Sequence, residues 1–427
     1  MNTFIVPLRS TKRHLLGITA AAFLPREALC LLPTQSKQCH YPALTSPQPT
    51  QSLQIFARFS SSTSFANKDS DKKNNSNHDN RRSSRFKMSA KAHTALDEMD
   101  EKGNFKRTAA GFLNTIEPNG RFPPEASRYH LYVALGCPWA AGTLAALRYK
   151  GLEDIIGHSI VHPTWRRTRP DDPDDHHLGW HFRNPGDDPV TNDLGHGSFE
   201  CDDALVPDTV NGAATIRELY EMGKDETGKY STPVLWCNTE KAIVCNESLE
   251  ILKIFDAAFD VNGLSKHPER KLFPQDEKQQ SEAESLNEYI YPTVNNGVYR
   301  CGFAKSQSAY TTAHTELFAS LDRLEEHLRT RQEHQEFLTG DDLTWIDLRL
   351  YMTLVRFDPV YGVYFKASHR RIGTDYPHML RFMRRCYAIP AVRAATNIRH
   401  IKMHYFSSHP VLNTYGIIPE SNGPALE

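Results

Sequence analysis

Downstream of residue 105, hydrophobic positions follow two different spacings along the chain. Short stretches of four to seven residues with strand composition occur at residues 129–135, 155–161, 233–237 and 242–245. Helical periods alternate with these runs at residues 140–148, 216–222 and 247–259. The predicted order of elements is therefore βαβαββα.

The hydrophobic pattern is helical in the rest of the chain. No strand signal follows residue 262, and apolar residues recur at the intervals of amphipathic helices. An α/β domain thus precedes an all-helical domain. Thr344 and Asp347 have capping-box spacing and are predicted to begin one of the helices. The predicted helices span residues 275–294, 310–330, 343–357, 377–387 and 392–403.

A long connection at residues 162–208 follows the second predicted strand. It is rich in proline, aspartate, histidine and glycine, and a loop of this length in a compact domain is either disordered or functional. His176, His177 and His181 lie there beside four aspartates and mimic a metal cluster. Their spacing matches no single metal site, so a solvated loop is favoured and no metal ion is expected.

The first 88 residues differ in composition from the rest. Up to residue 67 there are six basic residues and one acid in a stretch rich in serine, threonine and glutamine, which is typical of a transit peptide. The sequence at residues 57–61 resembles a mitochondrial cleavage context, and the polar run Lys68–Arg85 is predicted to be disordered. We expect import into mitochondria, with plastids as the alternative. Translation from Met88 would give a cytosolic product.

Charge and cysteine content exclude several classes of protein. The 50 lysines and arginines balance 51 aspartates and glutamates, which leaves no excess basicity for a nucleic-acid surface. No apolar run reaches the 18 residues of a membrane span. The 8 cysteines are too sparse and irregular for a disulfide framework or zinc knuckles. We expect neither nucleic acid nor a membrane as a partner.

Cys137 carries the sharpest chemical signal. It lies between the first predicted strand and the first predicted helix, in the sequence Gly-Cys-Pro-Trp-Ala. The positive end of a helix dipole favours a thiolate, and Pro138 is tolerated in the first helical turn. Ala140 stands where a dithiol oxidoreductase has its second cysteine, so any disulfide of Cys137 must form with a partner molecule. The alternative is a buried structural cysteine in a βα turn.

Two further features lie at the starts of later elements. Thr232-Pro233 opens the third predicted strand, where a cis peptide would turn the Thr232 backbone outward to pair with a peptide-like ligand. An ordinary edge-strand proline is the alternative. Glu247 and Ser248 begin a predicted helix, where they serve either as caps or as a ligand site.

Together these features resemble the glutathione transferase superfamily. Three further stretches, at residues 294–300, 356–361 and 404–410, look like the Xi class, the glutathionyl-hydroquinone reductases. The resemblance runs from about residue 111 to 419. It implies a thioredoxin-like glutathione-binding domain at residues 105–260, an all-α glutathione-transferase domain at 261–405, a tail at 406–427, and a homodimer.

The resemblance also implies a two-step thiol exchange. The Cys137 thiolate attacks the sulfur of a glutathionyl-hydroquinone, and a second glutathione resolves the mixed disulfide as glutathione disulfide. An Omega-type thioltransferase or dehydroascorbate reductase, or a non-catalytic binding protein, are the alternatives. The implied quinol-side residues are Tyr291, Tyr361 and Tyr405. The implied glutathione-binding residues are Trp180, Lys229 (where the family often has arginine), Thr232, Pro233, Glu247 and Ser248.

Overall fold

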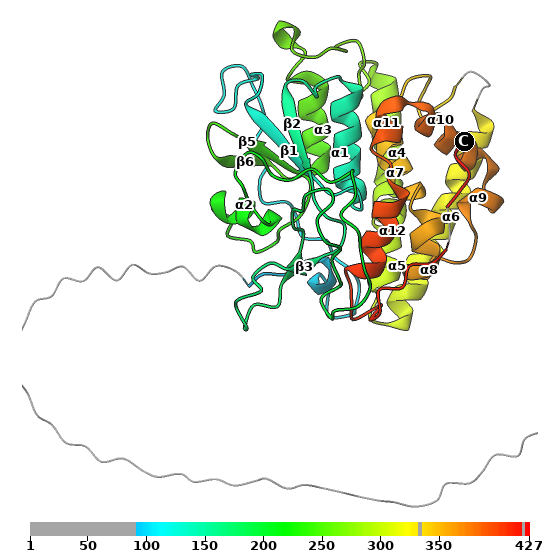
Figure 1. Ribbon diagram of the computed structural model, residues 1–427. Coiled ribbons are helices and arrows are strands. Elements are labelled where there is room, and N and C mark those ends of the chain that lie inside the picture. Colours follow the sequence, from blue (N-terminus) through cyan, green and yellow to red (C-terminus); the bar gives the residue numbers. More distant parts are fainter. Residues whose placement is uncertain (1–90, 332–334, 421–422) are drawn as a thin grey trace, which may run out of the picture. The chain divides into compact units, whose positions relative to one another are not determined.

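The computed structural model describes residues 91–331, 335–420 and 423–427. The predicted transit peptide, the polar run at residues 68–85 and Met88 lie outside the described residues. Within the described part, an α/β domain with a mixed sheet precedes a helical domain, as the hydrophobic pattern predicts (Figure 1). No helix in this part of the chain is long and apolar enough to cross a membrane.

Four strands form the central sheet in the order β2-β1-β5-β6. Strand β1 pairs parallel to β2 and antiparallel to β5, and β5 pairs antiparallel to β6. All five residues of β1 are buried, which explains why its sequence is largely apolar, with His130 as the one ionisable imidazole. The strands span Tyr129–Val133 (β1), Ile156–Ile160 (β2), Val234–Cys237 (β5) and Ala242–Cys245 (β6).

Alternate residues of β1 face two different helical layers. Leu131 and Val133 belong to a core cluster with residues of α1 (Pro138–Tyr149) and α3 (Ser248–Ala257). Tyr132 packs instead in the cluster that contains residues of α2 (Ile216–Met222). Helices α1 and α3 therefore cover one face of the sheet and α2 the other, as Figure 1 shows.

The helical domain begins beyond α3 and contains two short π-helical segments, η3 and η4. The capping box at Thr344 is confirmed, because the Thr344 N–H donates to Asp347 Oδ2 at 2.8 Å at the start of α7. The elements are α4 (Glu277–Ile290), η3 (Tyr291–Asn295), α5 (Gly297–Phe303), α6 (Gln307–Thr330), α7 (Trp345–Leu354), η4 (Phe357–Tyr361), α8 (Gly362–Tyr364), α9 (Ile372–Asp375), α10 (Pro377–Ala388), α11 (Pro390–Ala394) and α12 (Ile398–Ser407).

The prediction of one helix at residues 392–403 was wrong. The chain forms α11 and α12 there, with a break before Asn397, whose side chain accepts from the His400 N–H at 2.9 Å and caps α12. Both short helices bury residues of the same core, so the hydrophobic pattern runs across the break.

The long connection at residues 162–208 has its own structure. Two short strands, β3 (Arg166–Arg167) and β4 (Leu178–Gly179), pair antiparallel, and Trp180 and Phe199 are buried. The disordered alternative therefore does not describe this loop. It is tied to α12 by the hydroxyls of Thr164 and Ser407, which are 2.7 Å apart.

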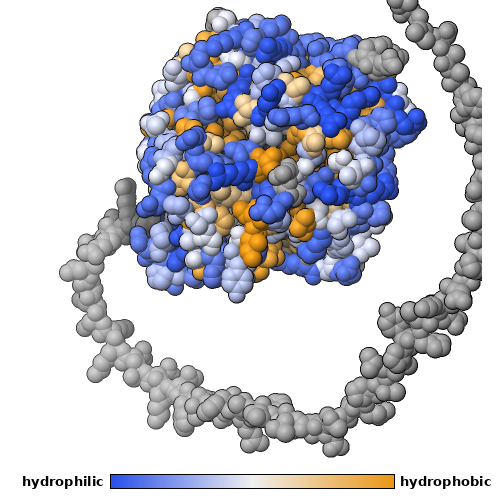
Figure 2. Space-filling view, turned by 45° about the vertical axis from the view of Figure 1, so that its right-hand side comes forward, coloured by the Kyte–Doolittle hydropathy of each residue, from blue (hydrophilic) through white to orange (hydrophobic). Residues whose placement is uncertain are grey.

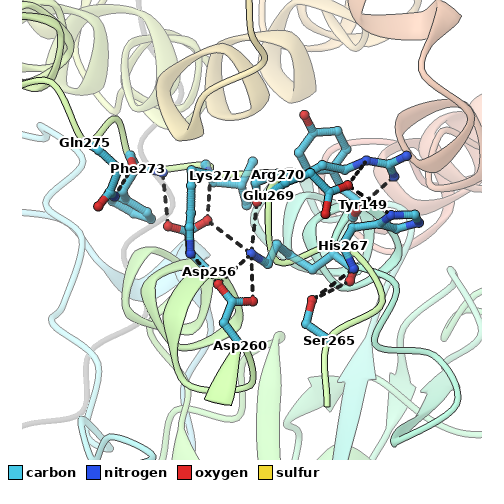
Figure 3. A network of polar contacts seen from close by, with 12 residues as sticks. Tyr149, Asp256, Asp260, Ser265, His267, Glu269, Arg270, Lys271, Phe273 and Gln275 are labelled. Atoms are coloured by element: carbon cyan, nitrogen blue, oxygen red, sulfur yellow. Dashed lines mark hydrogen bonds and ion pairs between the residues drawn. The ribbon is translucent and has the colours of Figure 1, made fainter. Parts of the chain in front are cut away.

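A buried lysine, Lys150, fastens the connection between the two domains, and its partners Asp260 and Arg270 are labelled in Figure 3. Lys150 at the end of α1 is fully buried, and its Nζ lies 3.0 Å from Asp260 Oδ1 and donates to the Arg270 carbonyl at 2.9 Å. Asp256 accepts from the backbone N–H groups of Leu272 and Phe273. These contacts satisfy a buried cation and fix the chain on its way from α3 to α4.

Candidate active site

Cys137 is the N-cap of α1, as the sequence predicts. Its Sγ lies 3.6 Å from the carbonyl oxygen of Thr232, to which it donates a hydrogen bond. The Thr232-Pro233 peptide bond is cis. Ala140, one turn further along α1, is fully buried in the core. The cysteine and the Thr232 backbone, 95 residues apart in sequence, thus meet at one point.

Cys137 differs from the other free cysteines of the described residues in being only partly buried. Cys237 and Cys245 lie in core strands, and Cys301 and Cys386 lie in helices. Burial raises the pKa of both Cys245 and Cys301 to about 12. These thiols remain protonated near neutral pH and do not compete with Cys137 as nucleophiles.

Arg356 of the helical domain holds the loop that carries Cys137. Its guanidinium is fully buried and donates to the carbonyl of Gly136 at 3.1 Å and to that of Leu135 at 2.8 Å. Gly136 is required by close packing, because a Cβ there would lie 2.5 Å from the Cβ of His404. The sequence motif around Arg356 gives no sign of this role, because the contact spans 220 residues.

Two adjoining cavities flank Cys137, and five residues that line both include Arg107, Trp139 and Thr232. We call them the polar cavity and the aromatic cavity. The polar cavity is further lined by Pro233, Glu247, Ser248, Tyr291 and Arg349. The aromatic cavity is further lined by Cys137, Trp165, His177, Trp180, Tyr299, Phe303, His404, Tyr405 and His409.

Glu247 and Ser248 open helix α3 at the wall of the polar cavity. Glu247 is the N-cap, and its Oε1 accepts from the Leu249 N–H and from the Ser248 hydroxyl, each at 3.3 Å. The capping interpretation is therefore confirmed, although both hydrogen bonds are long. Their position on the cavity wall leaves these residues accessible to a ligand as well.

Three tyrosine hydroxyls meet beside the aromatic cavity. Tyr405 lies 2.6 Å from Tyr299 and 3.1 Å from Tyr361, and Tyr299 and Tyr361 are 3.4 Å apart. Burial raises the pKa of each of these phenols, so all three keep their protons. The candidates chosen from the sequence included Tyr361 and Tyr405 but missed Tyr299, whose signal was its place in the Asn-Asn-Gly-Val-Tyr run.

Tyr291 does not join this trio. Its ring centroid lies 5.9 Å from that of Trp139, and the Arg349 guanidinium lies 4.8 Å from the ring centre. The structure therefore places Tyr291 in the polar cavity, whereas Tyr405 lines the aromatic one.

Trp180, from the long connection, forms part of the wall of the aromatic cavity. Its ring lies 4.5 Å from that of His404 and 5.5 Å from that of Trp165. Burial and nearby His409 lower the pKa of His404 well below its usual value, so this imidazole is neutral. The wall that Trp180 and His404 form is therefore aromatic and uncharged.

Lys229 fastens an N-terminal segment that we call the strap, residues 93–111. Its Nζ donates to Glu98 Oε1 at 2.5 Å and to the Thr108 carbonyl at 3.1 Å. The side chain of Glu98 is 1% exposed, so the ion pair is shielded from solvent. Lys229 lines both cavities, but its charge is already matched by the strap.

The loop histidines have local partners. His177 lies 2.9 Å from the Thr168 hydroxyl, and His181 lies 3.0 Å from the Thr164 carbonyl oxygen. Within residues 91–331, 335–420 and 423–427, no three histidine, cysteine or acidic side chains are grouped so that they could hold a metal ion.

Comparison with known proteins shows to which family this chain is similar. The model of the glutathione S-transferase N-terminal domain matches residues 136–258, and that of the C-terminal domain matches residues 307–385. Glutathionyl-hydroquinone reductase YqjG of Escherichia coli is 38% identical over 340 residues, which are 78% of this chain and 92% of YqjG. Glutathione S-transferase omega-like 2 of Schizosaccharomyces pombe is 36% identical over 337 residues, 78% of this chain and 97% of the relative.

Solved structures similar to this chain come from the same family as the relatives found by sequence. The crystal structure of glutathione-S-transferase Xi from Phanerochaete chrysosporium has a TM-score of 0.63 and 41% identity, covering 74% of this chain and 97% of that one. The glutathione-bound structure of YqjG has a TM-score of 0.62 and 38% identity, covering 74% and 93%. The chain therefore belongs to the glutathione transferase superfamily and, within it, to the Xi class.

Proposed function

We propose that this protein is a glutathione-dependent reductase that cleaves glutathionyl-hydroquinones and releases the free hydroquinone. The observation that carries the proposal is that a partly buried cysteine at the N-terminus of α1 and two hydrogen-bonded tyrosines line one cavity. The cavity offers an attacking sulfur on one side and neutral phenols on the other. The name of the relative YqjG supports this substrate class.

In the first step, the Cys137 thiolate attacks the sulfur of the glutathionyl thioether. An S–S bond forms between Cys137 and glutathione, and the bond between sulfur and the aromatic carbon breaks. The electron pair stays with that carbon, which takes up one proton and completes the hydroquinone. Tyr299 and Tyr405 line the cavity and hold phenolic protons, so they are the groups that supply or relay this proton.

The roles of the three tyrosines named from the sequence then differ. Tyr361 does not line the aromatic cavity; it hydrogen-bonds to Tyr405 and orients the hydroxyls of Tyr299 and Tyr405. Tyr291, on the wall of the polar cavity, is a glutathione-side residue rather than a proton donor to the quinol.

In the second step, another glutathione thiolate attacks the glutathione sulfur of the mixed disulfide. Glutathione disulfide leaves and the Cys137 thiolate is restored. An external thiol is necessary because Ala140 occupies the position of a resolving cysteine. The catalytic cycle therefore consumes one further glutathione for each hydroquinone released.

Glutathione itself is held along the wall that joins the two cavities. Thr232 precedes the cis-proline and lines both cavities, and Trp180 covers the ligand from the aromatic side. Glu247 and Ser248 bind the γ-glutamyl end. Lys229 contributes through the strap, because its Nζ is held by Glu98. The glutathione-bound structure of YqjG supports this choice of ligand.

A second candidate is an Omega-like thioltransferase or dehydroascorbate reductase. It shares Cys137 and the glutathione site, and the name of the Schizosaccharomyces pombe relative favours it. The tyrosine trio distinguishes the two, since a carbon leaving group needs a proton and a thiol leaving group does not.

The deciding experiment mixes the purified protein with a glutathionyl-hydroquinone and glutathione and follows hydroquinone release by chromatography. Dehydroascorbate reduction and disulfide exchange are measured in parallel. Fast hydroquinone release supports the reductase. Fast dehydroascorbate reduction without hydroquinone release would support the Omega-like alternative instead.

We also propose a homodimer and import into mitochondria, with plastids as the alternative destination. Exposed apolar side chains in the C-terminal tail, Val411, Leu412, Tyr415 and Ile417, offer surface for association. Figure 2 shows one face of the molecule, on which apolar areas lie among a larger hydrophilic surface. Light scattering of the purified protein tests the dimer.

A further inference from the structure

Arg349 on α7 is a buried cation whose charge is unmatched. It is 8% exposed, and its guanidinium lies 5.3 Å from the Trp139 ring centre and 4.8 Å from that of Tyr291. It donates one hydrogen bond, from Nη1 to Asn287 Oδ1 at 3.1 Å, while its buried Nε has no partner. Among the described residues, no carboxylate lies within ion-pair distance of Arg349.

Arg107 of the strap brings a second guanidinium to the same indole. It lies 5.4 Å from the Trp139 ring centre and 5.3 Å from that of Tyr299, and its Nε donates to Asn296 Oδ1 at 3.1 Å. No ion pair involves Arg107 within the part of the chain that the structure describes. Two unmatched cations from different parts of the fold therefore flank one tryptophan at the polar cavity.

This arrangement is unfavourable in the free protein. Like charges repel, and a buried guanidinium without an anionic partner loses hydration that one neutral hydrogen bond and contacts with aromatic rings only partly replace. Burial, together with nearby Arg107, lowers the pKa of Arg349, whereas Tyr291 and Glu247 counteract that shift. An anionic group bound in the cavity would relieve both penalties.

One carboxylate, that of Glu247, also lines the polar cavity. The charges of the cavity therefore indicate which charges its ligand carries. A site with one carboxylate and two guanidinium groups complements a group that carries an ammonium and a carboxylate on the same carbon. In glutathione only the γ-glutamyl end has both charges, because the glycine end has a carboxylate alone. The polar cavity is therefore matched to the α-amino acid end of the tripeptide.

We propose that Arg349 and Arg107 bind the α-carboxylate of the γ-glutamyl residue of glutathione, while Glu247 binds its ammonium. The proposal rests on the proposed function only in taking glutathione as the ligand. In this proposal, three parts of the chain contribute residues to the glutathione site: the thioredoxin-like domain, the helical domain and the strap. Neither arginine lies in the stretch matched by the N-terminal domain model, which is residues 136–258.

The test uses unreactive ligands and calorimetry on the full-length protein. S-methylglutathione is compared with its 4-aminobutanoyl analogue, which keeps the ammonium but lacks the α-carboxylate, and with its glycine ethyl ester. In the unaltered protein the analogue should bind about tenfold or more weakly than S-methylglutathione, the usual effect of losing a charge-assisted hydrogen bond. Arg349→Met should weaken S-methylglutathione and its ethyl ester by the same factor and leave the analogue unchanged.

Arg323→Met is the matched control. Arg323 lies 3.9 Å from the ring centre of Tyr289, so the substitution removes the same kind of stacked guanidinium away from the cavity. Its binding of all three ligands should equal that of the unaltered protein. Arg349→Met should melt at the same temperature as the unaltered protein or higher, because it removes an unmatched buried charge, whereas a purely structural arginine would lower the melting temperature.

Arg107→Met gives an independent arm, since the strap can be altered without touching α7. It should reproduce the selective loss of affinity for ligands that have the α-carboxylate. Equal losses for S-methylglutathione and the 4-aminobutanoyl analogue in both variants would overturn the assignment. A loss confined to ligands with a free glycine carboxylate would also overturn it. If the unaltered protein bound no S-methylglutathione, the proposed function itself would fail.

Discussion

The hydroxyl groups of Tyr299 and Tyr405 lie 2.6 Å apart although 106 residues separate them in the sequence. One belongs to α5 and the other to α12, so the contact exists only when the helical domain has packed completely. Both residues line the cavity that contains Cys137. This pair links the folding of the helical domain to the chemistry of a cysteine in the other domain.

Tyr405→Phe should slow hydroquinone release by about a hundredfold, the lower end of what a general acid contributes. The ring that packs in the core is kept and the hydroxyl alone is lost, so affinity for glutathione should not change. Tyr364→Phe is the control, because Tyr364 bonds to His409 3.1 Å away and lies outside the trio. Comparable turnover in the two variants would remove Tyr405 from the proton path.

Cys137→Ser should abolish hydroquinone release and leave the melting temperature nearly unchanged. A serine hydroxyl at a helix N-terminus is not a nucleophile at neutral pH, yet it caps the helix well. Cys245→Ser should do the opposite, since Cys245 is fully buried and a hydroxyl there is poorly accommodated. Mass spectrometry of the protein after incubation with substrate should show a glutathione adduct only when Cys137 is present.

Much of this fold could be predicted because its signals are local. The four strands are short stretches in which apolar residues predominate, and the Gly-Cys-Pro sequence by itself indicates that Cys137 lies at a helix N-terminus. The break between α11 and α12 was missed because amphipathicity continues through it. Asn397, a residue type that often caps helices, was the local signal for a helix start at this position.

The candidate site could be predicted less completely, because its decisive contacts are long-range. Lys229 bonds to Glu98, 131 residues upstream, and no local pattern shows that its charge is matched there. Tyr291 and Tyr361 lie at opposite ends of two π-helical segments, η3 and η4, yet Tyr291 packs against Trp139 and Tyr361 hydrogen-bonds to Tyr405. In the sequence, Arg349 is an ordinary arginine of a predicted helix. Only the structure shows that its guanidinium is buried and that its Nε has no hydrogen-bond partner.

Acid should destabilise the protein below about pH 6.5, partly through His130. Burial lowers the pKa of His130 from 6.5 to about 4, against the opposing effect of Asp208. Between those values the unfolded chain binds a proton that the folded protein does not, so stability falls as pH decreases through this window. His130→Gln should remove about 3 kcal/mol of that loss between pH 6.5 and 4, by the usual conversion of pKa shifts. Denaturant unfolding at several pH values measures it, and an unchanged slope would contradict the prediction.

Residues 1 to about 60 should direct import and be removed on arrival. A fusion of Met1–Lys68 to a fluorescent reporter should enter mitochondria, or plastids in a plant cell, and shorten on a gel. The control fusion carries Arg9, Lys12, Arg13 and Arg26 replaced by glutamine, because import depends on the positive charge of the segment. A cytosolic reporter of full size would refute the transit peptide.

Glu247→Gln separates the two roles that the structure gives to this residue. The amide oxygen of glutamine can still accept from the Leu249 N–H, so the cap of α3 survives and the free energy of unfolding should change by less than about 1 kcal/mol. The negative charge is lost, so the ammonium of glutathione loses its partner and the Kd for glutathione should rise by about tenfold or more.

Glu250→Gln is the matched control for this substitution. Glu250 lies one turn further along α3 and pairs with Lys253 at 2.8 Å on the exposed face, outside the walls of both cavities. It carries the same charge change without access to the ligand, so glutathione affinity should stay the same. Calorimetric binding and thermal unfolding on both variants decide the matter. If Glu247→Gln bound glutathione as tightly as the control, Glu247 would be a helix cap alone, and the charge pattern that assigns the γ-glutamyl end to the polar cavity would lose its anionic member.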